Sequence, residues 1–174
     1  MRRVSRYAAL MLTLVPVVVG AHAQSSTEAR QAAQDTRVRG YWVDPSTGLM
    51  WAGKDNFGKD LDWRQAAQYC IDLQLAGYAD WRLPAIGELE RIYDRSATAL
   101  GRGGRRSEKS QPWHVKGDLL LTGRTWSATH LNGVGGRPSG WALLFDFLNG
   151  RPFEEEERFR TGKRALCVRG DVQP

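Results

Sequence analysis

The hydrophobic and polar positions of the chain divide it into three parts. Residues 7–20 are almost wholly apolar, residues 24–37 are polar and lack large apolar side chains, and mixed sequence begins near Val38. In this last part, short apolar runs bounded by turn residues alternate with stretches in which apolar residues recur every three or four positions. The pattern predicts one α+β domain over residues 38–171, after a disordered or weakly helical leader over residues 24–37.

The domain is expected to begin with two strands joined by a turn. Tyr41–Val43 and Leu49–Trp51 flank the sequence Asp-Pro-Ser-Thr-Gly. Within it, Pro45 presets φ and Gly48 allows the positive φ that ends a tight turn.

Two helices follow in the predicted order of elements. Asp62 is suited to cap a helix over Trp63–Leu75 that ends before Gly77. A second helix is expected to open at Pro84 or Ala85. The side chains expected on the buried faces are Ala66, Ala67, Cys70 and Leu73 in the first helix, and Ile86, Leu89, Ile92 and Tyr93 in the second. Glu88 and Glu90 are expected to face solvent.

The second half of the domain has less regular patterning. Long loops are expected over residues 94–116 and 132–140, where glycines are frequent and large apolar residues are scarce. Residues 141–147 alternate as in a strand, and Asn149-Gly150 is a hairpin turn signal. Other short strands are expected at residues 119–121, 125–128 and 165–169. The run Glu154–Glu157 is interpreted as a solvated strand end or loop.

The first 23 residues have the organisation of a secretory signal peptide. Three arginines precede the apolar run, and Ala21-His22-Ala23 supplies the small residues that a signal peptidase reads. The run is shorter than the ~20 residues that span a bilayer, although an uncleaved membrane anchor is the alternative interpretation. We therefore expect a periplasmic or secreted protein with no membrane span after cleavage.

Cleavage after residue 23 also removes three arginines, which lowers the net charge from +6 to +3. This small excess does not by itself predict a nucleic-acid partner, and an exported protein would rarely meet one. Arg102, Arg105 and Arg106 gather in the first long loop, where they could grip sulfates or carboxylates. A solvated, flexible loop is the alternative interpretation.

The chain has two cysteines, Cys70 and Cys167. In an oxidising compartment an even pair predicts one disulfide, and two unrelated buried thiols are the alternative. The bond would tie the first helix to the last strand.

Motifs for nucleotide binding, zinc proteolysis, serine hydrolysis and EF-hand calcium binding do not occur in the sequence. His114 and His130 lie sixteen positions apart without a nearby cysteine, so they do not predict a metal site. We therefore predict no catalytic residue, no metal and no cofactor.

Tryptophan is the positive signal, because all seven lie after the signal peptide. Trp113 sits in a polar loop beside His114, and Trp141 opens a strand after a glycine-rich loop. Exposed indoles stack on sugar rings or anchor protein partners. The predicted ligand-binding residues are therefore Trp113, His114, Arg124, Arg137 and Trp141, helped by Arg102, Arg105 and Arg106. The tryptophans expected in the core are Trp42, Trp51, Trp63, Trp81 and Trp126.

Three stretches together resemble a known bacterial family: Thr47–Trp51, Gly77–Pro84 with Glu88-Leu89 after it, and Cys167–Arg169. The second reads Gly-Tyr-Ala-Asp-Trp-Arg-Leu-Pro and is the most specific. Trp126-Ser127-Ala128 and Trp141-Ala142 lie between them at the expected places. From Tyr41 to Gly170 the chain resembles the Lcl C-terminal domain family, named for the C-terminal part of the Legionella collagen-like adhesin.

The resemblance implies a C-type-lectin-like fold, with two helices, a small and mostly antiparallel sheet, and long second-half loops as the binding surface. It also implies adhesion through sulfated polysaccharides, although the collagen-like stalk is missing here. The calcium-site motifs Glu-Pro-Asn, Gln-Pro-Asp and Trp-Asn-Asp do not occur, so calcium-mediated sugar binding is not predicted. Asp80 and Arg82 are expected to satisfy backbone groups or each other.

The sequence thus predicts an exported, non-enzymatic binding module whose partner is an anionic polysaccharide or an envelope protein. Two alternatives remain. One is an enzyme of the formylglycine-generating type, whose relatives use active-site cysteines. The other is a structural or assembly subunit of an envelope complex.

Overall fold

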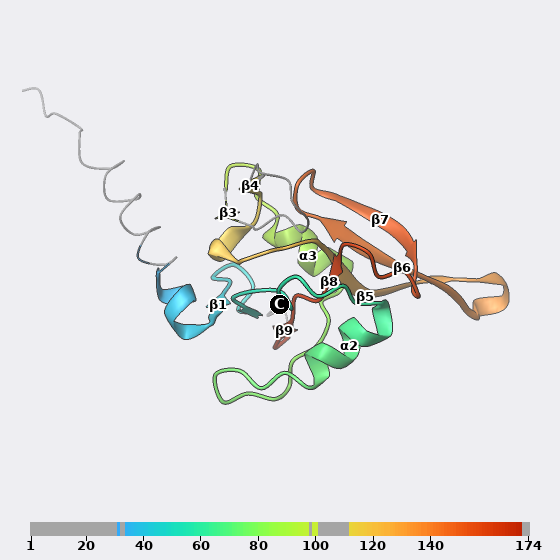
Figure 1. The fold of residues 1–174 in the computed structure, drawn as a ribbon, viewed down its shortest axis with the longest axis horizontal. Coiled ribbons are helices and arrows are strands. Elements are labelled where there is room, and N and C mark those ends of the chain that lie inside the picture. The colour runs from blue at the N-terminus through green and yellow to red at the C-terminus, as the bar shows by residue number, and fades with distance from the viewer. Residues whose placement is uncertain (1–30, 32–33, 98, 101–111, 172–174) are drawn as a thin grey trace, which may run out of the picture.

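The computed structural model describes residue 31 and residues 34–97, 99–100 and 112–171 (Figure 1). The expected signal peptide, most of the expected leader, and Arg102, Arg105 and Arg106 lie outside the described residues. Residues 34–39 are helical, and Thr36 within them is buried. Across the described residues, no helix is both long enough and apolar enough to cross a membrane.

The first sheet joins the two ends of the domain. Strands β1 (Tyr41–Val43) and β2 (Met50–Ala52) form the predicted hairpin, and β9 (Val168–Arg169) pairs with β2. In the turn, Asp44 accepts hydrogen bonds from the Ser46 and Thr47 hydroxyls at 2.8 Å. Burial opposes ionisation of Asp44, but these hydrogen bonds outweigh it and lower the pKa of the carboxyl.

Helix α2 (Trp63–Ile71) begins where predicted and ends earlier than predicted. The Asp62 carboxylate accepts a hydrogen bond from the Gln65 N–H at 2.9 Å, while the Gln65 side chain accepts one from the Asp62 N–H. This capping box fixes the first turn. Beyond Ile71 the chain makes a tight turn at Ala76 and Gly77, which both have positive φ, so the prediction of helix to Leu75 is wrong.

Helix α3 (Ile86–Ile92) is confirmed, with Leu89 and Ile92 fully buried. The expectation that Glu88 faces solvent is wrong, because its side chain is 11% exposed and is paired with Arg82. Helical periodicity alone placed Glu88 on the polar face, but the chain preceding α3 folds back over that face.

A four-stranded sheet forms the other layer. It has the order β7-β6-β5-β8, and its pairs are antiparallel except for β5 with β8. The strands are β5 (Arg124–Asn132), β6 (Pro138–Asp146), β7 (Arg151–Glu156) and β8 (Lys163–Arg164). The β6–β7 hairpin turns at the predicted Asn149-Gly150. A separate short pair joins β3 (Ala99–Leu100) to β4 (Pro112–Trp113).

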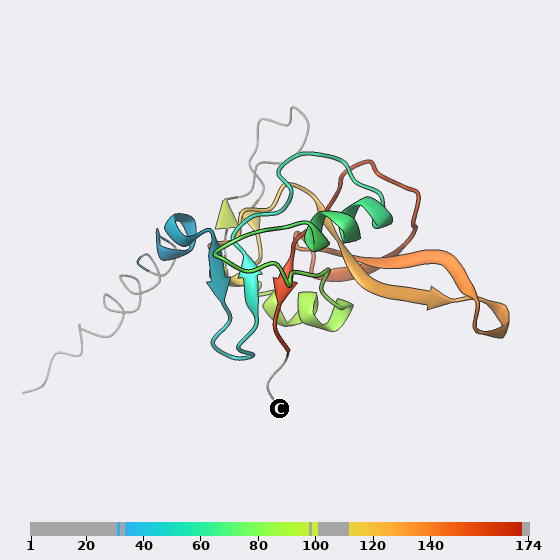
Figure 2. The same cartoon turned by 90° about the horizontal axis from the view of Figure 1, so that it is seen from below.

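The predicted loop over residues 132–140 is instead the end of a long hairpin. Strand β5 runs to Asn132, β6 begins at Pro138, and the 3₁₀ turn η2 (Val134–Gly136) closes the tip. Figures 1 and 2 both show this hairpin projecting from the rest of the fold. Strand pairing uses backbone groups, so it does not need the apolar side chains on which the prediction relied.

The expected strand at residues 119–121 is not formed either. Leu119 and Leu121 are fully buried, but they follow the 3₁₀ turn η1 (Lys116–Asp118), and only Leu120 makes an isolated bridge, to Lys54. The apolar run over residues 119–121 therefore indicates burial in the core and not a β-strand.

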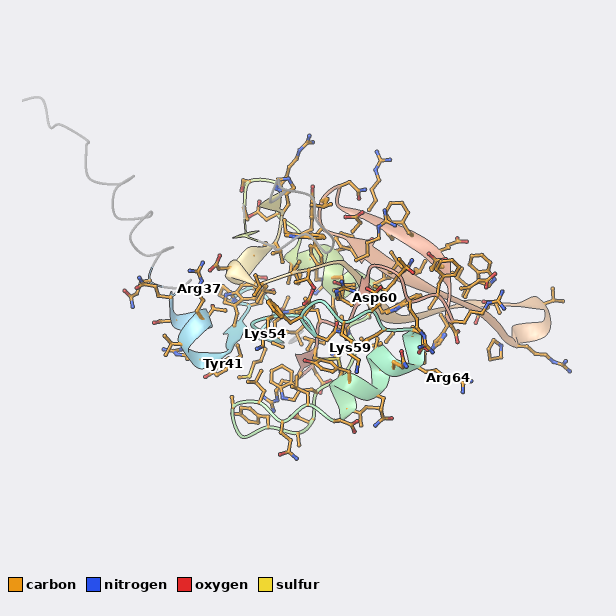
Figure 3. All side chains as sticks on the ribbon, viewed as in Figure 1. Arg37, Tyr41, Lys54, Lys59, Asp60 and Arg64 are labelled. Atoms are coloured by element: carbon orange, nitrogen blue, oxygen red, sulfur yellow. A yellow bond between two sulfur atoms is a disulfide. The ribbon has the colours of Figure 1, made fainter. Side chains whose placement is uncertain are left out.

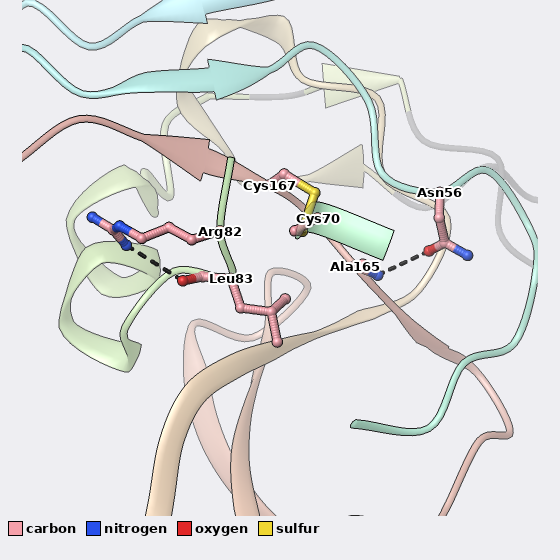
Figure 4. The surroundings of a disulfide bond; sticks show 6 residues. All are labelled: Asn56, Cys70, Arg82, Leu83, Ala165 and Cys167. Atoms are coloured by element: carbon pink, nitrogen blue, oxygen red, sulfur yellow. Dashed lines mark hydrogen bonds between the residues drawn. A yellow bond between two sulfur atoms is a disulfide. The ribbon is translucent and has the colours of Figure 1, made fainter. Parts of the chain in front are cut away.

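The core joins both layers, and the predicted disulfide lies within it. Cys70 of α2 bonds to Cys167, just before β9, with Cα atoms 5.4 Å apart (Figure 4). In the same segment between β8 and β9, the Ala165 N–H donates a hydrogen bond to the Asn56 side chain at 2.8 Å. Among the predicted core residues, Trp51, Trp81 and Trp126 are buried, and Trp42 and Trp63 are partly buried. The α+β class is confirmed.

Candidate functional site

The five predicted ligand-binding residues that the structure describes do not form one site. Trp113 is 5% exposed and belongs to the core cluster that contains Trp51 and Phe145, so the expectation of an exposed indole is wrong. His114 is half-buried: its backbone N–H donates to the Phe147 carbonyl at 3.0 Å, and its ring Nδ1 lies 2.9 Å from the Ala97 carbonyl oxygen. The contacts of Trp113 and His114 are therefore with the fold itself, which indicates a structural role for both residues.

Arg124 lies in a cavity of about 590 Å³ that Trp113 also lines. Its Nε donates to Asp146 at 3.0 Å, and a second guanidinium there, Arg164, donates to Asp60 at 2.6 Å. Each cation faces a carboxylate, so an incoming anion would have to displace one. This cavity is therefore a poor receptor for a single negative group.

Arg137 and Trp141 lie on the projecting hairpin. Arg137 is exposed beside its tip, and Trp141 is 39% exposed at the base, where β6 meets β7. A second cavity of about 590 Å³ adjoins this indole, and we call it the Trp141 groove. Its lining residues come from three elements: Asp62, Arg64 and Gln65 at the start of α2, Ser139, Gly140 and Trp141 in β6, and Glu156, Glu157 and Arg158 at the end of β7.

Backbone contacts of Glu157 hold these three elements together. The Trp63 N–H donates to the Glu157 carbonyl at 2.9 Å, and the Glu157 N–H donates to the Gly140 carbonyl at 2.9 Å. Trp141 pairs directly with Glu156 in the β6–β7 register. The groove is thus built on paired backbone, which fixes the strand position that carries Trp141.

Trp63, between the lining residues Asp62 and Arg64, holds the first turn of α2 against β5. Its indole N–H donates to the Ser127 carbonyl at 2.8 Å, and its ring lies 4.2 Å from the His130 ring, centroid to centroid. His130 in turn places Nδ1 2.8 Å from the Glu157 carboxylate. His130, whose side chain is partly exposed, therefore contacts both the start of α2 and the end of β7.

The carboxylates in the groove are already engaged. Asp62 pairs with Arg160 at 3.0 Å, Glu156 pairs with Arg158, and Glu157 contacts His130. Arg64 is different, since no carboxylate among the described residues pairs with it. The groove therefore offers an exposed indole and a guanidinium that forms no ion pair with a described carboxylate.

Within the described parts of the chain, no cluster of three or more histidine, cysteine, aspartate or glutamate side chains could hold a metal ion. The groove instead offers a flat apolar face and hydrogen-bond donors. These are the groups that bind sugar rings and their anionic substituents.

A family model for the Lcl C-terminal domain matches residues 40–169. The chain belongs to this family. A search of curated proteins with the whole chain found no match. The stretches that carry the family resemblance meet around β9: Arg82 and Val168 exchange two backbone hydrogen bonds, of 2.9 and 3.0 Å, and Trp51 pairs with Val168. In the Lcl domain these stretches therefore build the scaffold.

The sequence did not identify most of the groove. No pattern in the sequence singles out Arg64 or Gln65, and the run Glu154–Glu157 is predicted to be a solvated strand end or loop. The structure places residues 154–156 at the end of β7, which agrees with the strand-end interpretation, and Glu155 pairs at 2.8 Å with Lys163, a buried lysine. Only Trp141 was identified correctly as a surface indole, and its signal was the glycine-rich segment directly before it.

Proposed function

We propose that this Lcl domain is an exported, non-enzymatic binding module that holds a sulfated or carboxylated saccharide in the Trp141 groove. The observation that carries the proposal is the exposed Trp141 indole beside Arg64, a guanidinium unpaired among the described residues. An indole stacks on the apolar face of a sugar ring, and a guanidinium binds sulfate or carboxylate through two parallel hydrogen bonds. The expected C-type-lectin-like arrangement and the periplasmic or secreted location are parts of this proposal.

The size of the groove suits a saccharide better than a protein surface. Its volume of about 590 Å³ lies within the roughly 300–1,000 Å³ of small-ligand sites. Two of the acidic lining residues, Glu156 and Asp62, are paired with Arg158 and Arg160, which reduces their repulsion of an anion. A protein partner of an assembly subunit would need a broader apolar surface than one indole.

The formylglycine-generating alternative gains nothing from the structure. That chemistry uses cysteine thiols, and both cysteines of the chain are joined in the disulfide. A binding role requires no free thiol, so it fits the disulfide without further assumptions.

Titration of the protein with a heparin oligosaccharide tests the proposal. Trp141→Ala is expected to weaken binding about tenfold or more, as truncation of a central aromatic contact does. Phe159→Ala is the matched control, because Phe159 is 51% exposed and does not line the groove.

Equal binding by the two variants would overturn the placement of the site. Failure of the wild-type protein to bind at low salt would overturn the saccharide proposal itself. Co-purification with an envelope protein, insensitive to added glycans, would then favour the assembly-subunit alternative.

A further inference from the structure

At the opposite end of α2 from the Trp141 groove, the structure has a largely apolar cavity of about 500 Å³. We propose that this cavity binds a medium- or long-chain carboxylate, with its hydrocarbon chain inside and its head group at Lys54. The lining residues are Thr36, Arg37, Gly40, Ala52, Gly53, Lys54, Tyr69, Leu73, Leu75, Asp118 and Leu120. The site is separate from the groove and does not depend on the saccharide proposal.

The walls of the cavity come from elements that are far apart in sequence. Ala52 belongs to β2, and Leu73 and Leu75 follow α2. Leu120 forms an isolated β-bridge with Lys54, two residues after β2. All four side chains are hydrocarbon. They therefore favour an apolar ligand by removing its surface from water.

Close backbone contact seals one side. The Gly53 N–H donates to the Gly40 carbonyl at 2.7 Å, and a Cβ added at Gly53 would lie 2.9 Å from that oxygen. A larger residue at Gly53 would push residues 34–40 away from β2. The close contact between Gly53 and Gly40 holds the helical segment over residues 34–39 beside the cavity.

The charge at the rim is unbalanced. Arg37 is compensated, because its Nε and Nη2 lie 2.8 and 2.7 Å from Asp118 Oδ2. Lys54 is exposed and has no carboxylate partner among the described residues. The three charged lining residues therefore leave one net positive charge at the mouth of an apolar space, which is complementary to a carboxylate head group.

Tyr69 supplies a second polar group. Its hydroxyl makes no hydrogen bond to the described residues, although the ring lines the cavity. Burial, and then the nearby charge of Asp55, raise the pKa of Tyr69 above its ordinary value. The phenol is therefore protonated at neutral pH, and it can donate a hydrogen bond to a carboxylate oxygen.

A ligand here would not compete with one in the groove. Figure 3 places Arg64 at one end of α2, and Arg37 and Lys54 toward the other end. The groove uses the first turn of α2, whereas this cavity uses Tyr69 in its last turn. The disulfide at Cys70 anchors the helix beside the cavity.

Calorimetric titration of the exported protein with decanoate tests the proposal, with 1-decanol as the uncharged ligand of equal chain length. We expect decanoate to bind and Lys54→Glu to weaken that binding about fivefold to tenfold, because one attraction becomes a repulsion. Tyr69→Phe is expected to weaken it by a smaller factor. Lys59→Glu is the matched control: it makes the same charge change at a nearby exposed lysine that does not line the cavity (Figure 3).

Absence of decanoate binding would overturn the proposal. So would equal losses in the Lys54 and Lys59 variants, or decanol binding as tight as decanoate binding. Retention on phosphatidylglycerol vesicles without decanoate binding would show that the cations meet a membrane surface, and it would also overturn the proposal. Lys54 is exposed, so its variant is expected to fold, and thermal unfolding of each variant verifies this.

Discussion

Arg82 and Glu88 are joined by two parallel hydrogen bonds, of 2.8 Å from Nη1 to Oε2 and 2.7 Å from Nη2 to Oε1. The same carboxylate accepts a hydrogen bond from the Ala85 N–H at 2.7 Å, which caps α3. Arg82 Nη2 also donates to the Gly170 carbonyl at 3.0 Å. One ion pair thus connects the start of α3 with the end of the domain.

Glu88→Gln is expected to lower the free energy of unfolding by about 1–3 kcal/mol, because it removes the charge from a half-buried, bidentate pair. Burial of Glu88 opposes its ionisation, but the hydrogen bonds from Arg82 outweigh this and lower its pKa from the ordinary value of 4.5. The stabilisation is therefore fully present above pH 4.5 and is lost as the pH falls through the lowered pKa.

Urea unfolding between pH 7 and pH 3 measures this effect. The wild-type protein should lose more stability than Glu88→Gln as the pH falls below ~4.5. Glu90→Gln, at an exposed site on the same helix, should follow the wild-type curve. Parallel curves for the wild type and Glu88→Gln would contradict the assigned role of the pair.

Replacement of both cysteines by serine tests the contribution of the disulfide. The Cys70–Cys167 bond closes a loop with a sequence separation of 97. On the chain-entropy account, its loss costs about 4–5 kcal/mol of unfolding free energy. Chemical denaturation of the double variant measures this loss, and a change of less than about 1 kcal/mol would mean that the unfolded chain is already constrained.

Gly150 and Gly136 are a matched pair for testing how close packing against a glycine affects stability. Both have positive φ, at 69° and 72°, so alanine is strained at either position. A Cβ at Gly150 would overlap the Tyr93 ring, whereas one at Gly136 would meet no atom within 4 Å. We expect Gly150→Ala to be less stable than Gly136→Ala by about 1–3 kcal/mol, as in other overpacked sites. Equal thermal unfolding of the two variants would contradict this.

Local patterns were sufficient for much of the fold. The Asp62 helix cap, the periodicity around Leu89 and the Asn149-Gly150 turn each act within a few residues, so they can be recognised from sequence. Trp113 is an example of a residue whose burial local patterns do not predict. Its neighbours along the chain are polar, and it is buried only because distant residues such as Trp51 and Phe145 pack around it.

The candidate site was less predictable for the same reason. Arg64 and Trp141 are 77 positions apart in the sequence, and they become neighbours only when Glu157 ties α2 to the end of β7. The family stretches did not reveal this arrangement, because residues such as Arg82 and Val168 hold the scaffold together at β9 instead.

Arg64→Ala tests the electrostatic half of the proposed saccharide site. Binding of a sulfated oligosaccharide should weaken, and its dependence on salt should become shallower, because one guanidinium contact is removed. Arg151→Ala is the control, since Arg151 is exposed on β7 and does not line the groove. An identical salt dependence in both variants would place the anion elsewhere, for example on Arg102, Arg105 and Arg106.

The most direct test of the account is to follow the seven tryptophan indole N–H signals by two-dimensional NMR during titration with a heparin oligosaccharide. If the Trp141 groove is the binding site, the Trp141 signal shifts most, with smaller shifts at Trp63, which adjoins the lining residue Arg64 in α2. The buried Trp51 and Trp113 signals stay in place. Shifts that leave the Trp141 signal unchanged, while the oligosaccharide binds, would contradict the account.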